Sequence, residues 1–182
     1  MITKWFKNYL ASMISSIGVS TPTSVQAKKP NGNMVYIGFP GSSSIVSNAF
    51  PFTSYADVGY SSGARGIWLG TGTTTPTEDD YNMQNQITSG ISCSTSKSNG
   101  VDANNNAFSK FIITVTNTSG SSITISEAAY VQGIPAASTP SGSVSWEAIM
   151  LDHTLLDSPV TIAAGDVAVI EYTLKCALPT SA

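Results

Sequence analysis

The chain has 182 residues, enough for one domain with a substantial hydrophobic core. Only 10% of the residues are charged, the formal net charge is −3, and the eight Lys and Arg residues are scattered along the chain. Without a basic stripe to neutralise phosphates, the composition argues against nucleic acid as a partner.

The first predicted element is an amphipathic helix over residues 1–17. Its apolar residues recur at three- and four-residue steps, which is typical of a helix with one buried face. The stripe consists of Trp5, Phe6, Leu10, Met13, Ile14 and Ile17. A helix this short is marginal in water, so we expect the stripe to anchor the protein on a neighbouring subunit. No stretch reaches the roughly 18 apolar residues that a membrane span needs.

Residues 18–33 are rich in Gly, Pro, Ser, Thr and Asn, which predicts a linker. After it, apolar residues recur at every second position, as in strands with one buried face. Such segments cover residues 33–39, 65–72, 108–120, 121–131, 142–152, 158–163 and 166–176. They predict a mainly β domain over residues 34–182, an antiparallel β-sandwich of jelly-roll or immunoglobulin-like type. The Gly-containing connection at 117–122 is interpreted as a hairpin.

An acidic run, residues 78–80, lies in a long loop between the strand around Trp68 and the apolar Ile87. Thr77 precedes the run at the N-cap position of a single predicted helical turn, whose exposed N–H groups favour carboxylates. Calcium is the alternative ligand, but the spaced D-x-D-x-D pattern of a calcium loop is missing. We therefore expect no metal here, and a structural loop with Tyr81 packed beneath the turn. Its residues are Thr77, Glu78, Asp79, Asp80 and Tyr81.

The remaining reactive side chains form no recognised catalytic motif. His153 lies near Asp152 and Asp157, but no G-x-S-x-G elbow accompanies it, and we interpret it as a hydrogen-bonded residue in a connection between strands. Cys93 and Cys176 lack the spacing of a zinc site, and the sequence leaves open whether they pair. We expect a protein that is not an enzyme and needs no cofactor.

Aromatic residues raise a different function, a carbohydrate-binding or adhesive β-sandwich whose exposed rings stack on sugars. Trp68 and Trp146 both lie within apolar strand patterns, where a large aromatic normally fills the core. The core is therefore our prediction for both. The polar stretch 96–108 is interpreted as a solvated loop, and the formal glycosylation motif at Asn117 is treated as chance.

Two parts of the sequence resemble small structural proteins of tailed bacteriophages. One is "GTGTTTPTEDDYNMQNQIT" at residues 70–88, which departs from the pattern at Met83 and at residues 84–86. The other combines "VTNTSGSSITISEAAYV" at 115–131 with "LDHTLLDSPVTIAAGDVAVIEYTL" at 151–174. The resemblance implies a structural protein of the virion, with other capsid or tail proteins as partners and a homo-oligomeric state.

Within the virion, the nearly uncharged surface and the predicted N-terminal anchor favour one position. We expect a decoration or accessory subunit on the head, attached through its N-terminal segment. A tail or neck component is the alternative.

Overall fold

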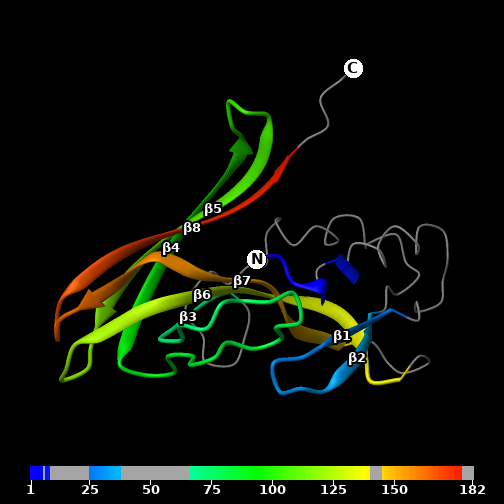
Figure 1. The fold of residues 1–182 in the computed structure, drawn as a ribbon, viewed down its shortest axis with the longest axis horizontal. Coiled ribbons are helices and arrows are strands. Elements are labelled where there is room, and N and C mark those ends of the chain that lie inside the picture. Colours follow the sequence, from blue (N-terminus) through cyan, green and yellow to red (C-terminus); the bar gives the residue numbers. More distant parts are fainter. Residues whose placement is uncertain (6, 9–24, 38–65, 140–144, 178–182) are drawn as a thin grey trace.

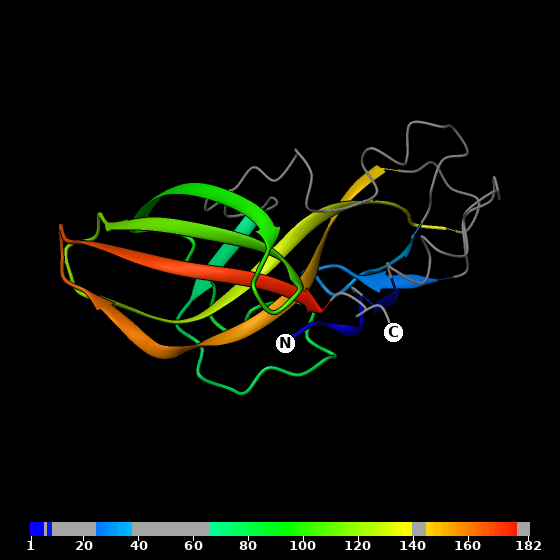
Figure 2. The same ribbon diagram turned by 90° about the horizontal axis from the view of Figure 1, so that it is seen from above.

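The structure is a computed structural model that describes residues 1–5, 7–8, 25–37, 66–139 and 145–177. These residues form eight strands arranged in two antiparallel sheets (Figures 1 and 2). The prediction of a mainly β, antiparallel fold is thereby confirmed. The strands are β1 (Gln26–Lys28), β2 (Met34–Ile37), β3 (Gly66–Gly70), β4 (Ile91–Val101), β5 (Asn106–Asn117), β6 (Ile123–Ala137), β7 (Ser145–Ile162) and β8 (Val167–Ala177).

The larger sheet is built around β6. One side of β6 pairs with β7, and the other side pairs with β3 and then with β2, to which β1 is added. The smaller sheet has the order β4-β5-β8. Two segments were predicted as separate strands, 142–152 and 158–163. Their residues 145–152 and 158–162 belong to the single long strand β7, which is bulged rather than broken.

The two sheets face each other over one hydrophobic core. The alternation in β5 was predicted correctly, because Phe111, Ile113 and Val115 are buried there. The Phe111 ring packs against Tyr130 of the larger sheet and Tyr172 of the smaller one, with centroids 5.6 and 6.4 Å apart. The opposite face of the larger sheet carries a second cluster, covered by the loop 71–89. It consists of Trp68, Met83, Ala129, Val131 and Met150.

The hairpin predicted at 117–122 is wrong, because the chain passes from the smaller sheet to the larger one there. Asn117 holds this crossing: it is fully buried, and its Nδ2 donates to Ser121 O at 2.8 Å and Ile162 O at 2.9 Å. A buried amide that already uses both protons cannot accept a glycan. A short glycine-containing connection fits a hairpin within one sheet and a crossing between two sheets equally well. The alternation of apolar residues is also the same whether the next strand lies beside the first or in the facing sheet.

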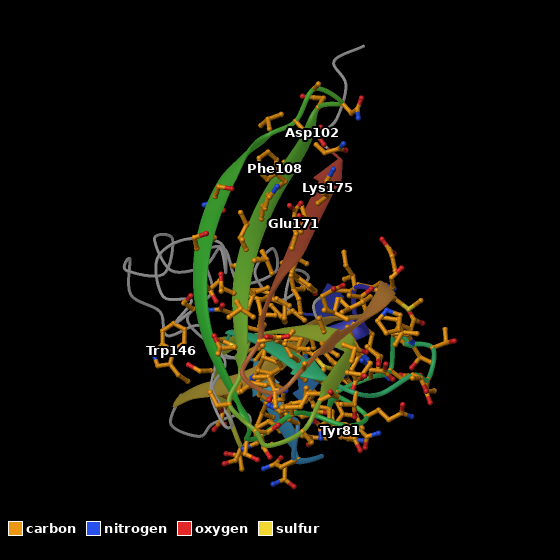
Figure 3. All side chains as sticks on the ribbon, turned by 90° about the vertical axis from the view of Figure 1, so that its left-hand side faces the viewer. Tyr81, Asp102, Phe108, Trp146, Glu171 and Lys175 are labelled. Atoms are coloured by element: carbon orange, nitrogen blue, oxygen red, sulfur yellow. The ribbon has the colours of Figure 1, made fainter. Side chains whose placement is uncertain are left out.

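A second correction concerns residues 96–108, which form the end of a long β4–β5 hairpin and not a loop. Asp102 closes its turn by accepting from Asn104 N at 2.9 Å and Asn106 N at 3.0 Å, while Asn105 has a φ of 60°. Together with residues 171–177 of β8, residues 97–110 project away from the body of the molecule (Figure 3). We call this projection the arm.

The two cysteines are too far apart to pair. Cys93 lies opposite Val115 and Cys176 opposite Ala107, so eight positions of β5 separate them. That distance is about 26 Å along the strand, whereas a disulfide requires Cα atoms within about 7 Å. Cys93 is a free, half-buried thiol, and burial raises its pKa to about 11.

In the described part of residues 1–17 the structure does not support the predicted helix, and β1 lies within the segment 18–33 that was predicted as a linker. Trp5 belongs to the main core with 6% of its surface exposed, and Ala27 of β1 is fully buried in the same core. The packing of the domain therefore includes residues before 34. Phe6, Leu10, Met13, Ile14 and Ile17 lie outside the described residues. Among the residues that are described, no helix has the length and apolar character of a membrane span.

Candidate functional site

The acidic run forms a tight turn whose hydrogen bonds run opposite to the predicted cap. Asp80 N donates to Thr77 O at 3.2 Å, and no helix follows. The Asp80 carboxylate accepts from Thr77 N at 2.9 Å and from Thr77 Oγ1 at 2.7 Å. The aspartate thus closes the turn from its last position, whereas we had expected the threonine to cap it from the first. We call residues 77–80 the acidic turn.

The N-terminal segment lies along the acidic turn and along β7. Lys4 N donates to Glu78 O at 2.8 Å, and the indole Nε1 of Trp5 donates to Asp80 O at 2.9 Å. On its other side, the fully buried Thr3 binds β7 through Thr3 N and Leu151 O, 3.0 Å apart. These contacts explain why the predicted anchor residue Trp5 is buried in its own domain.

Each carboxylate of the acidic turn has its own cationic partner. Glu78 pairs with Lys7 at 2.6 Å, Asp79 pairs with Lys4, and Asp80 binds the imidazole of His153 at 2.7 Å. Within the described part of the chain, no group of three His, Cys, Asp or Glu side chains is placed to hold a metal ion. The turn is a docking site for the N-terminal segment and for His153.

His153 bridges two acidic residues in the interior. It lies inside β7, not in a connection between strands, and only 3% of it is exposed. Its Nδ1 lies 2.7 Å from Asp80 Oδ2, and its Nε2 lies 2.8 Å from Glu127 Oε2. Glu127 is fully buried on β6 and was not among the residues singled out from the sequence. The bridge therefore ties the loop 71–89 to the two central strands of the larger sheet.

The second oxygen of Glu127 binds the backbone of the loop. Oε1 accepts from Gly72 N at 3.0 Å and from Asn85 N at 2.9 Å. A Cβ added at Gly72 would lie 2.6 Å from that oxygen, and one added at Gly70 would lie 2.7 Å from Asn85 O. The two glycines are required because the loop backbone touches the carboxylate directly. A β-bulge between Ile125 and Glu127 turns this side chain onto the loop side of the sheet.

The ionisation of the three side chains follows from these contacts. Burial alone would lower the pKa of His153, but the hydrogen bonds to Glu127 and Asp80 outweigh it and raise the pKa. Burial would raise the pKa of Glu127 and of Asp80. Hydrogen bonds from His153 and from loop N–H groups lower the pKa of Glu127 instead, and hydrogen bonds from Thr77 and His153 lower the pKa of Asp80. The contacts thus favour an imidazolium held between two carboxylates, the His153 network.

This geometry suits structural stabilisation better than proton transfer. A general base needs a ring nitrogen that can reach a substrate, and both nitrogens of His153 are already bound to buried or half-buried carboxylates. The nearby Asp152 does not join the network, because its carboxylate accepts from the buried hydroxyl of Tyr172. We therefore interpret the His153 network as a clamp on the fold.

The structure also places the other predicted residues. Tyr81 is half-buried against the main core, and Lys28 Nζ lies 3.7 Å from its ring centroid. Trp68 is buried, as predicted. Trp146 contradicts the prediction of a core position, since 51% of it is exposed (Figure 3). It lies in the second position of β7, next to the end of the strand, where the apolar pattern no longer indicates burial.

In comparisons with known proteins, the chain has no significant match to a family model, a curated protein or a solved structure.

Thr77→Ala is expected to lower the free energy of unfolding by about 1 kcal/mol, because the acidic turn loses the bond from Oγ1 to Asp80. Thr75→Ala is the matched control, since Thr75 is exposed in the same loop. Thermal unfolding of both variants, with and without EDTA, measures the effect. Equal melting temperatures for the two variants, or a melting temperature that falls with EDTA and returns with calcium, would contradict the assignment.

Proposed function

We propose that the protein is a structural subunit of a bacteriophage virion and has no catalytic role. The observation that supports this best is where the bacteriophage-like segments meet. Gly72 and Asp80 come from the first segment, and Glu127 and His153 come from the two parts of the second. Asp80, Glu127 and His153 form the His153 network, and Gly72 donates to Glu127. These residues of the resemblance thus stabilise a scaffold, as an assembly protein requires.

The scaffold itself supports an assembly role. Two antiparallel sheets over a shared core fit a β-sandwich, and the arm presents strands that have no partner on their outer edges among the described residues. Such edges are available for pairing with other chains. Because Trp5 is engaged in its own domain, we assign attachment to the arm in preference to the N-terminal stripe.

We place the subunit on the head, as a decoration or accessory protein, with the tail or neck as the alternative position. The reason for this position is the surface, which is polar and nearly uncharged and therefore inert toward other molecules. Antibodies against the purified protein should label the heads of virions in electron micrographs. Labelling confined to the tail would reject the head position, and absence of the protein from purified virions would reject the proposed function.

The exposed Trp146 supports a second candidate, a carbohydrate-binding module. Its ring is half-exposed on β7, as a sugar-stacking residue would be. A glycan array probed with the wild-type protein and with Trp146→Ala separates the candidates. Binding that disappears in the variant would favour the module, whereas no binding by the wild type would leave the virion assignment as the better one.

A further inference from the structure

We propose that a second copy of the chain pairs with the outer edge of β8, in antiparallel register, with a two-fold axis passing between the Thr173 residues of the two copies. The inference rests on the assembly role proposed above, and it names the partner and the surface. The inner edge of β8 pairs with β5, and no described residue pairs with the outer one. Figure 3 shows this part of β8 within the arm, away from the body of the molecule.

The charges of β8 are arranged symmetrically about Thr173. Glu171 and Lys175 lie two residues before and two residues after it, and both point to the exposed face of the sheet. In an antiparallel pair centred on Thr173, Glu171 of each copy lies directly opposite Lys175 of the other. Opposite charges at directly facing positions stabilise a strand pair, and so do facing threonines. One two-fold axis therefore creates two ion pairs and one Thr–Thr contact.

The same register extends ion pairs that already exist within each copy. Lys110 pairs with Glu171 at 2.6 Å, and Lys175 pairs with Asp102 at 3.3 Å. Across the two-fold axis, Glu171 would gain a second cation and Lys175 a second carboxylate. The resulting row alternates in sign, with each charge flanked by opposite ones. Exposed ion pairs contribute more in such networks than in isolation.

Exposed apolar side chains lie on the same face of the sheet as Glu171 and Lys175. Val167 and Val169, at the start of β8, are 57% and 62% exposed, and Ile112 of β5, which pairs with Glu171, is 38% exposed. Joining two copies along β8 would place these residues on a continuous six-stranded surface. The other edge of the arm lacks this pattern, because β4 carries a single charged residue, Lys97, and no carboxylate. A self-complementary charge arrangement is thus a property of the β8 edge.

Charge exchange tests the pairing in the full-length protein by sedimentation equilibrium. The wild type should dimerise, and Glu171→Lys and Lys175→Glu should each weaken the dimer roughly tenfold or more, because both symmetric pairs become repulsive. Mixing the two variants one to one should restore dimers, since every facing pair is again of opposite sign. Ser96→Lys, on the exposed face of β4, is the control and should leave dimerisation unchanged.

Each alternative result has a defined meaning. A wild type that stays monomeric at all concentrations, a dimer that ignores both charge exchanges, or a mixture that stays monomeric would overturn the pairing. Higher salt should weaken the wild-type dimer, because exposed charges are screened. A dimer that is absent from virions would reject the proposed function alone, whereas a monomer present in virions would reject this inference alone.

Discussion

Replacing Glu127 with alanine is expected to lower the free energy of unfolding by about 3–5 kcal/mol, the usual cost of removing one partner of a buried ion pair. The variant leaves His153 in the interior with one carboxylate in place of two, and it leaves the N–H groups of Gly72 and Asn85 without their acceptor. Urea-induced unfolding measured by tryptophan fluorescence gives the value.

Asp157→Ala is the control for this prediction. Asp157 is an exposed carboxylate on β7, so its loss should cost far less than the loss of the buried Glu127. If the two variants proved equally stable, the His153 network would not be a clamp, and the burial of Glu127 would need another explanation.

The pH dependence of stability provides a second test of the same network. The raised pKa of His153 contributes stability that is complete below about pH 6.5, and this contribution is lost as the pH rises through the folded-state pKa. The lowered pKa values of Glu127 and Asp80 contribute stability above about pH 4.5, which is lost as the pH falls through their folded-state values. The difference in stability between wild type and Glu127→Ala should therefore be largest between about pH 4.5 and 6.5. A difference that is constant from pH 4 to 9 would contradict the imidazolium.

Trp5→Ala is expected to cost about 3–5 kcal/mol, as large aromatic truncations in a core do. The side chain is 6% exposed, and its indole donates to the acidic turn. Deletion of residues 1–8 should destabilise at least as much, because Thr3 and the two lysine ion pairs are lost as well. Chemical denaturation followed by circular dichroism measures both variants.

The matched control is Trp146→Ala, which truncates the same side chain at a half-exposed position and should cost clearly less. A deletion variant as stable as the wild type would show that the N-terminal segment is independent of the domain. That result would restore the original prediction of a detachable anchor.

The strands that could be predicted from sequence are those with one apolar face. In β5 the residues at every second position from Ser109 to Asn117 are buried, and in β8 Ile170 and Tyr172 are buried, so the faces of both strands were assigned correctly. The strand β4 was missed because its outward positions are serines and its inner positions include Thr95, Lys97 and Asn99. Such a strand is held by the backbone pairing with β5, and hydrophobic periodicity cannot detect a strand of that kind.

The candidate site was predicted only in part, because its contacts are far apart in sequence. The acidic turn was recognised as a turn from local chemistry, although its hydrogen bonds were assigned in the wrong direction. His153 was judged by its neighbours in sequence, yet its partners lie 73 and 26 residues away. The one local signal for Glu127 was a carboxylate within the otherwise uncharged segment 123–137, which indicates a specific partner in a buried strand.

The position of Thr3 against Leu151 sets the order in which the chain can fold. The segment that contains Thr3 leaves the ribosome long before the strand that receives it, with 148 positions between the two residues. The side chain of Trp5 therefore stays without its native contacts until both the acidic turn and β7 have been synthesised. Contacts of such long range slow folding, and exposed apolar segments favour aggregation during that delay. Closure by the N-terminal segment is consequently a late step of folding, and the yield of the protein should depend on how well this segment is shielded during synthesis.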